Sequence, residues 1–234
     1  MLAHGSWHGG WCWRRVAEPL RALGHSVYAP SFTGMGDRAH LLGPRIDIET
    51  FVEDLVQLIV SEELRDVVLV GHSFGGVPVS GVADRIPEAI GHLVYLDAIV
   101  PESGKSVFST YPAAEAQARI EAAERANGGL AAPAPLALPQ SIGLRPGSAD
   151  YDWVLRRLTP HPMRTYTSAL TLRNLVGNGL PRTYVHCSEP SYATIEGSRA
   201  LVRSWPGWRW IELRAPHEAM ITHPDEIARI LLAI

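Results

Sequence analysis

The chain has 234 residues, of which 46% are hydrophobic and 19% charged, so it can bury a sizeable core as one α/β domain spanning residues 1–234. The formal net charge is only −3 and no Lys/Arg-rich run occurs, which argues against binding to nucleic acid or a membrane surface through bulk charge. Two cysteines are too few for a disulfide scaffold, and no segment resembles a signal peptide or a membrane span. A cytoplasmic protein is expected.

Apolar runs alternate with helix-period segments, which is typical of a mostly parallel sheet flanked by helices. Helices are expected over residues 13–20, 51–59, 77–86 and 225–234. Strands are expected over residues 26–29, 67–70, 92–96, 182–187 and 208–213. Residues 101–180 are rich in Ala and Pro but contain helix-period patches and aromatic residues that require burial. We therefore expect a mainly helical cap inserted between two late strands.

The sequence GHSFG at residues 71–75 matches G-x-S-x-G, directly after a predicted buried strand and before a predicted helix. A tight strand-to-helix turn has no room for side chains at its flanks, which accounts for the glycines, and it exposes the Ser73 hydroxyl at the carboxyl edge of the sheet. The alternative is a glycine-rich turn without chemistry, whereas a dinucleotide site would require G-x-G-x-x-G. The pattern predicts that Ser73 is a nucleophile.

A serine nucleophile requires a base, and the chain order in this architecture is Ser, acid, His. His217 follows the last predicted strand and precedes the final helix, so its loop reaches the carboxyl edge of the sheet beside Ser73. His223 begins the final helix, and the earlier histidines occupy positions where a structural imidazole is more common. His4 and His8 lie in a glycine-rich loop rather than on a helix, so a metal site is not expected. His217 is the predicted base.

An oxyanion hole requires two backbone N–H donors, one of which belongs to the residue after the nucleophile, Phe74. The other should come from an early loop, and HGSWHGG at residues 4–10 has glycines that permit close backbone approach. Ser6 is the predicted second donor. Trp7, beside it, is a candidate for lining the substrate pocket, with a purely structural aromatic as the alternative.

The segments HGSWHGGWCW, VLVGHSFGG, LVYLDAIVP and APHEAM, in this order and spacing, resemble the α/β-hydrolase superfamily. The resemblance covers essentially the whole chain and is weakest in the cap. It is closest to plant hydroxynitrile lyases, plant methyl esterases and their bacterial esterase-like relatives. It implies the α/β-hydrolase fold and a Ser-His-acid hydrolase with a cap over an apolar pocket, working without metal or organic cofactor.

Two departures from this family concern the start of the chain and the chemistry. Only residues 1–3 precede the His-Gly loop, so the first strand is expected to be short or truncated. The lyases have Thr where this chain has Gly5, and Lys where it has Glu218. These replacements favour ester hydrolysis over C–C cleavage.

A third departure leaves the catalytic acid open between Glu189 and Asp97. The family places an Asp in the loop after the strand that follows the cap, and that position falls on Pro190 here. Glu189 precedes it, and its longer side chain can compensate for the displaced backbone, so Glu189 is weakly favoured. Asp97, at the end of an earlier strand, is the rival, and its alternative role is to anchor its own loop.

The sequence thus predicts a serine hydrolase for a small or medium apolar carboxylic ester, with lactones and thioesters included. A tailoring enzyme that uses the same pocket for C–C cleavage, elimination or cyclisation is one alternative. A non-catalytic ligand receptor on the hydrolase scaffold is another. The expected partner is a small ester-like molecule, no nucleic-acid or membrane partner is expected, and a homodimer stays open.

Overall fold

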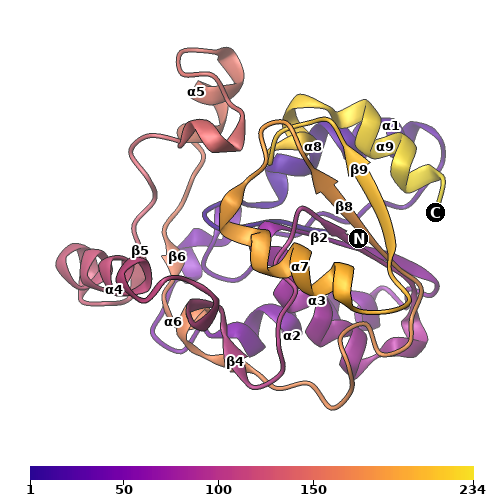
Figure 1. Cartoon of the computed structure of the whole chain (residues 1–234), viewed down its shortest axis with the longest axis horizontal. Coiled ribbons are helices and arrows are strands. Elements are labelled where there is room, and N and C mark those ends of the chain that lie inside the picture. Colours follow the sequence, from indigo (N-terminus) through magenta and orange to yellow (C-terminus); the bar gives the residue numbers. More distant parts are fainter.

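A five-stranded parallel sheet forms the centre of the computed structural model, which describes residues 1–234 (Figure 1). The strand order is β1-β2-β3-β8-β9, with β1 (Leu2–Ala3), β2 (Val67–His72), β3 (Ile90–Leu96), β8 (Arg182–Cys187) and β9 (Arg209–Leu213). All neighbours pair in parallel. The predicted α/β-hydrolase architecture is therefore confirmed, and four of the predicted strands are present.

The strand predicted over residues 26–29 is absent. This segment runs beside β1 and receives a hydrogen bond from the Leu2 amide to the Tyr28 carbonyl (2.8 Å), but it forms no ladder. Because β1 has only two residues, the segment has too short a partner to continue the sheet. Apolar alternation in the sequence does not reveal the length of a partner strand.

Helices cover both faces of the sheet, and each strand contributes to two cores. On one face lie α2 (Ile48–Ser61), α3 (Gly76–Arg85) and α7 (Glu196–Ser204); on the other lie α1 (Arg14–Ala22), α8 (Ala219–Thr222) and α9 (Pro224–Leu232). Leu69 belongs to the first core and Val70 to the second, since successive strand side chains point to opposite faces. This double burial explains the continuous apolar run in β2.

Local signals set where the helices begin. The Asp47 carboxylate accepts a hydrogen bond from the Thr50 amide, and the Thr50 hydroxyl accepts one from the Asp47 amide, which forms a capping box ahead of α2. Pro224 occupies the first position of α9, where its missing N–H costs nothing. The two helices pack on opposite faces of the sheet.

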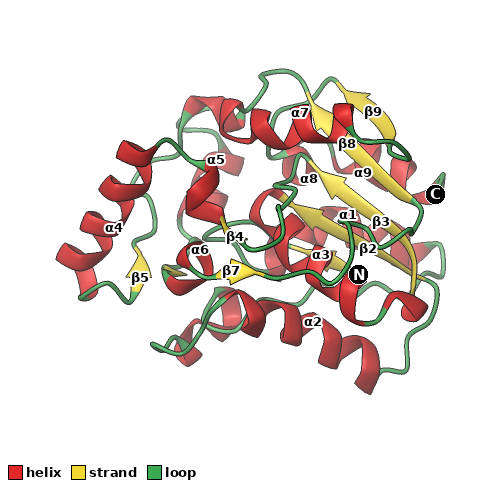
Figure 2. Cartoon of the chain, turned by 60° about the horizontal axis from the view of Figure 1, so that its bottom comes forward, coloured by secondary structure: helices red, strands yellow, loops and turns green.

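The segment predicted as a cap lies between β3 and β8. It contains α4 (Ala113–Asn127), α5 (Ala149–Leu155) and α6 (Arg164–Thr167), together with the short strands β4 (Lys105–Ser106), β5 (Ala131–Ala132), β6 (His161–Pro162) and β7 (Ala169–Leu170). β4 pairs with β7 and β5 with β6. Figure 2 shows the arrowheads of β2 and β3 pointing toward the side on which α4 and α5 lie. Residues 101–180 therefore sit beside the carboxyl edge of the sheet.

Tight packing at the start of α3 should make Gly76 intolerant of a side chain. A Cβ at this position would lie 2.2 Å from the Ile99 carbonyl oxygen, which is backbone and cannot rotate away. Gly76→Ala is expected to lower the free energy of unfolding by about 1–3 kcal/mol in urea titrations. Gly197→Ala is the control, because a Cβ there meets nothing within 4 Å. Its free energy of unfolding should rise by about 0.5–1 kcal/mol, since alanine favours the helix more than glycine does. Equal effects at both sites would contradict the packing argument.

Candidate active site

Ser73 occupies a sharp corner between β2 and α3. Its φ is +51°, in the left-handed region that costs a non-glycine residue energy and occurs where surrounding structure enforces it. A Cβ at Gly71 would lie 2.6 Å from the Gly75 carbonyl oxygen, and one at Gly75 would lie 2.7 Å from that of His4. The glycines thus allow the turn, as the G-x-S-x-G pattern predicts. The corner leaves Ser73 half-buried and lining a cavity.

His217 and Asp97 meet in the same cavity wall. Nδ1 of His217 donates to Oδ2 of Asp97 over 2.7 Å, although 120 positions separate them. Asp97 lies directly after β3 with φ +42°, and His217 lies in the loop between β9 and α8. His217 is almost fully buried and also lines the cavity. A hydrogen bond at Nδ1 fixes the imidazole tautomer that leaves Nε2 free to accept a proton.

Asp97 is fully buried and uses its second oxygen to bind Arg199. Oδ1 accepts hydrogen bonds from the Arg199 guanidinium (3.0 Å) and the Cys187 amide (3.3 Å). Burial alone would raise the pKa of the Asp97 carboxyl, but the hydrogen bond from His217 and the nearby positive charges outweigh it and hold the pKa below its ordinary value. Asp97 is therefore an ionised carboxylate aimed at the imidazole.

Glu189 does not contact any imidazole. Its amide donates to the Ala215 carbonyl (3.1 Å), while its side chain is exposed and makes no hydrogen bond or ion pair. Glu189 is exposed to solvent and is not part of the cavity wall. The arrangement favours Asp97 over Glu189 as the partner of His217, which is opposite to the preference drawn from the sequence.

Two rings hold the imidazole of His217 in place. His72 lies 4.6 Å away between ring centroids, and its Nε2 donates to the His217 carbonyl (3.0 Å). Burial, together with the neighbouring His217, lowers the pKa of His72 to about 3, so His72 stays neutral. Tyr192 lies 4.2 Å from His217 between ring centroids. His217 is thus confined by aromatic contacts as well as by its hydrogen bond.

The loop at residues 4–10 lies directly against the nucleophile corner. A Cβ at Gly5 would sit 2.9 Å from the Cβ of Ser73, so the loop backbone reaches Ser73 only because Gly5 has no side chain. Ser6 and Trp7 line the cavity, whereas the Phe74 side chain packs in the core against Phe51. Any contribution of Phe74 to the cavity is therefore made by its backbone. The Ser6 hydroxyl accepts a hydrogen bond from Tyr166 (2.6 Å).

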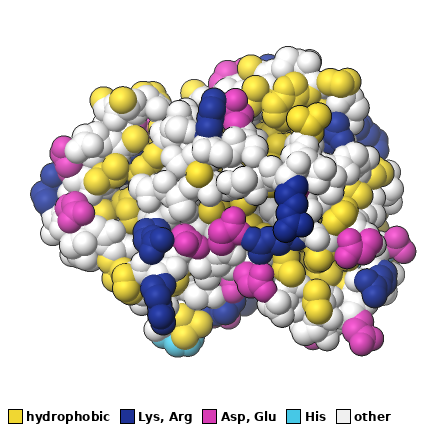
Figure 3. Space-filling view, turned by 90° about the horizontal axis from the view of Figure 1, so that it is seen from below, with side chains coloured by type: hydrophobic (Ala, Val, Ile, Leu, Met, Phe, Trp, Pro, Cys, Tyr) yellow, Lys and Arg dark blue, Asp and Glu magenta, His cyan; other side chains and the backbone are white.

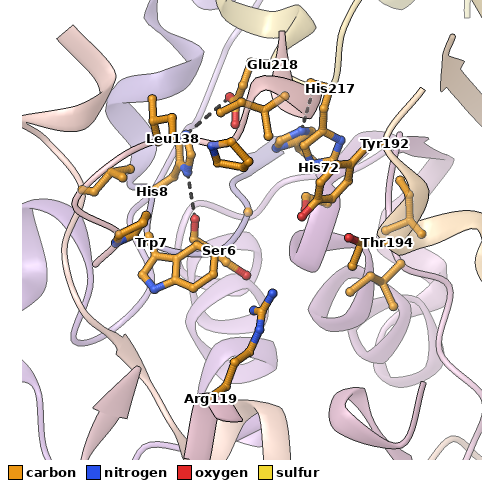
Figure 4. A pocket seen from close by; sticks show the side chains of 18 of the residues that line it. Ser6, Trp7, His8, His72, Arg119, Leu138, Tyr192, Thr194, His217 and Glu218 are labelled. Carbon is orange, nitrogen blue, oxygen red and sulfur yellow. Dashed lines mark hydrogen bonds and ion pairs between the residues drawn. The ribbon is translucent and has the colours of Figure 1, made fainter. Parts of the chain in front are cut away.

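The cavity opens between the carboxyl edge of the sheet and residues 101–180, and Figure 4 shows the side chains that line it. Its walls combine the polar groups around Ser73 with apolar residues from the cap and from the loop after β8: Pro135, Leu138, Pro139, Ile142, Leu158 and Ile195. A cavity with a few convergent polar groups and an apolar remainder suits small organic ligands. One end of the cavity is thus polar and the rest is largely apolar.

Glu218, which follows the imidazole, forms a buried pair with His8. Oε2 of Glu218 lies 3.4 Å from Nε2 of His8, and Nδ1 of His8 donates to the Ser6 carbonyl (2.8 Å). Burial alone would raise the pKa of Glu218, but the charge of His8 lowers it to about 2. For His8, burial lowers the pKa, while the charge of Glu218 outweighs this and raises it. The pair is therefore ionised.

This pair predicts a pH-dependent stability. A carboxyl whose folded pKa is about 2, against an ordinary 4.5, stabilises the fold above pH 4.5 and loses that contribution as the pH falls toward 2. The wild type should therefore be more stable than Glu218→Gln at pH 5–6, and the difference in free energy of unfolding should shrink toward pH 2. Urea titrations of both proteins across this range measure it. A difference that stays constant with pH would rule out the ionised pair.

Some cavity residues and supporting residues were not predicted from the sequence. Arg199 is one, although residues 198, 199 and 202 form the buried face of α7, and a charged residue on such a face indicates a buried partner. Arg119, Tyr192 and Thr194 also line the cavity and carry no sequence signal of their own. Neither a group of His, Cys, Asp or Glu suited to metal binding nor a helix long and apolar enough to cross a membrane is found.

The chain is similar to known proteins over its full length. The sequence model described as "Alpha/beta hydrolase family" matches residues 1–230, and the chain belongs to that family. It is 38% identical over 242 residues to a carbendazim hydrolyzing esterase from Nocardioides sp. (strain SG-4G), covering 100% of this chain and 98% of the relative. It is 29% identical over 251 residues to methylesterase 2 from Arabidopsis thaliana, covering 100% and 94%. The chain is a carboxylic ester hydrolase.

A solved structure is also similar over almost the full length. It is described as an extracellular alpha/beta-hydrolase from a Paenibacillus species that shares structural and functional homology with tobacco salicylic acid binding protein 2. Its TM-score is 0.83 at 25% sequence identity, and the match covers 99% of this chain and 96% of that one. The fold of almost the whole chain thus has a counterpart in a known structure.

Proposed function

We propose that the protein hydrolyses a small or medium, largely apolar carboxylic ester through an acyl-enzyme on Ser73. The observation that carries the proposal is the contact between His217 and the buried Asp97 in the wall of the cavity that Ser73 lines. A hydroxyl presented on a sharp backbone turn, an oriented imidazole and an ionised carboxylate are the parts that serine hydrolases use.

In the proposed mechanism, Oγ of Ser73 attacks the ester carbonyl carbon while Nε2 of His217 takes the hydroxyl proton. Backbone N–H groups of Ser6 and Phe74 stabilise the negative oxygen of the tetrahedral intermediate, each worth about 10²–10³ in rate. The intermediate collapses, and the alcohol leaves with the proton from His217. Water then attacks the acyl-enzyme by the same route and releases the carboxylic acid. Throughout, Asp97 stabilises the protonated imidazole without taking its proton.

The similar proteins support esters as the substrate class, since the relatives are named as a carbendazim hydrolyzing esterase and a methylesterase. Methyl esters are therefore the first substrates to test. The position of the lyase lysine is occupied by Glu218, whose carboxylate faces His8 and carries no positive charge for a cyanide leaving group. The chemistry of the cavity thus favours hydrolysis over C–C cleavage.

The test is a panel of chromogenic and methyl esters that varies the acyl and alcohol parts separately, together with labelling by a fluorophosphonate. We expect turnover of short esters and a mass increase located on Ser73 by peptide mass spectrometry. Labelling of Ser73 without turnover of any ester would point instead to a tailoring reaction in the same pocket. Neither labelling nor turnover would refute the proposed function.

A further inference from the structure

One positively charged group enters the cavity from the side opposite the polar end. Arg119 belongs to α4, and Figure 4 shows its guanidinium pointing into the cavity from below, toward the space between Ser6 and Thr194. The other charged groups of the lining, Glu218 and His8, are paired with each other. The cavity therefore contains one cation whose charge no buried anion balances.

Two aromatic rings hold the guanidinium of Arg119 in place through cation–π contacts. Its carbon lies 5.4 Å from the ring centroid of Trp7 and 4.9 Å from that of Tyr111, so two aromatic rings contact the cation. A single nitrogen donates to Glu115 one turn earlier on α4, over 2.8 Å. The side chain is only 23% exposed. Arg119 is thus ordered before any ligand arrives, which reduces the entropy cost of binding.

Most of the donors of Arg119 are unused. A guanidinium carries five N–H groups, and the bond to Glu115 is the only hydrogen bond that this one makes. Glu115 has a side chain that is 41% exposed, and exposed ion pairs contribute little. The remaining N–H groups form a planar fork that matches the two oxygens of a carboxylate. Neutral ester groups cannot satisfy such a fork as well as an anion does.

From these contacts we infer that Arg119 binds a carboxylate carried by the substrate at a distance from the ester that is cleaved. The substrate class is then an ester with a free acid at its far end, such as a monoester of a dicarboxylic acid. The apolar middle of the cavity takes the chain between the two ends. This inference rests on the proposed function for its catalytic readout, but binding at Arg119 is measurable without turnover.

The test uses monomethyl esters of linear dicarboxylic acids from succinate to suberate, each compared with its dimethyl ester. The two substrates of a pair differ at the far end, which is a charged carboxylate in one and a neutral methyl ester in the other, and in a twofold statistical factor. At the best chain length the wild type should prefer the monoester by about tenfold or more in kcat/KM. Arg119→Gln should reduce that preference about tenfold, mainly through KM, and Arg119→Lys should keep part of it, since it retains the charge and loses the fork.

Arg125→Gln is the matched control. Arg125 lies on the same helix and pairs with Glu121 at 3.7 Å, but its side chain is 71% exposed and does not line the cavity. The preference for the monoester should be unchanged in this variant. Thermal unfolding of all variants checks that α4 stays folded. A wild-type ratio near one at every chain length, or an equal loss on both substrates in Arg119→Gln, would overturn the inference.

A binding experiment separates this inference from the proposed function. Titration calorimetry of the monoesters with Ser73→Ala protein, with and without Arg119→Gln, requires no catalysis. Affinity should fall about tenfold when Arg119 is replaced, and higher salt should weaken binding to the Ser73→Ala protein only when Arg119 is present. If no ester is turned over but Arg119→Gln still weakens binding of the monoesters, the anion site is supported and the hydrolase mechanism is refuted. If esters are turned over but Arg119→Gln does not weaken binding, the hydrolase mechanism is supported and the anion site is refuted.

Discussion

Asp97→Asn is expected to lower kcat for ester hydrolysis about 10⁴-fold with little change in KM. Asparagine can offer its amide N–H to Nδ1 of His217, which stabilises the wrong imidazole tautomer, and it cannot stabilise the positive charge that develops on the ring. The 2.7 Å hydrogen bond between His217 and Asp97 identifies Asp97 as the residue that fixes the tautomer and stabilises the charged ring. Steady-state kinetics with the best ester of the panel measures the effect.

Glu189→Gln is the companion variant and should leave kcat within about a factor of two, because surface substitutions without contacts change little. Its side chain is exposed and contacts no imidazole. Asp97→Asn also weakens the buried contact with Arg199, so its thermal unfolding is recorded beside the kinetics. A folded Asp97→Asn protein with normal kcat, or a large loss in Glu189→Gln, would contradict the assignment of Asp97.

Ser73→Ala should show the deepest loss, about 10⁶-fold in kcat, because without the hydroxyl no acyl-enzyme forms. Binding of the intact ester should persist, since the cavity walls and the loop at residues 4–10 are unchanged. His217→Ala is expected to lose nearly as much, and the double variant no more, because the two groups act as a unit. Single-turnover kinetics and calorimetry measure the two quantities separately.

Ser191→Ala controls for the loss of a serine hydroxyl. Ser191 is exposed in the loop after β8 and does not line the cavity. Its replacement should leave ester turnover unchanged. Additive losses in the Ser73→Ala, His217→Ala double variant would instead mean that the hydroxyl and the imidazole act independently.

Much of the sheet was predictable because its signals are local. The strands at residues 67–70 and 182–187 are short apolar runs bounded by turn residues, and the GHSFG turn specifies its own backbone geometry. Ser73 follows from that turn, and the position of His217 follows from chain order. Residues 26–29 were mispredicted because their expected partner strand is only two residues long.

The acid could not be chosen from the sequence, and the reason is topological. β3 and β8 are adjacent parallel strands, with Leu96 paired to Val185, so the residues after both strands lie at the same edge of the sheet. The choice between Asp97 and Glu189 depends on where the two loops turn, which long-range bonds decide. Arg199, from α7, binds Asp97 and marks it as the buried carboxylate. The side of α4 that faces the cavity could not be predicted from the sequence either, because it depends on how residues 101–180 pack.

With Asp97 as the acid, the loop after β3 and the neighbouring loop after β8 have different functions. If β3 supplies the acid, the loop after β8 has no part in proton transfer, yet it still carries Tyr192 and Thr194 into the cavity wall. Apart from Tyr192, which packs against the ring of His217, residues 188–195 are then free to diverge without loss of the reaction. Natural variation and directed evolution aimed at new esters should therefore succeed in this loop, while the short turn after β3 tolerates almost none.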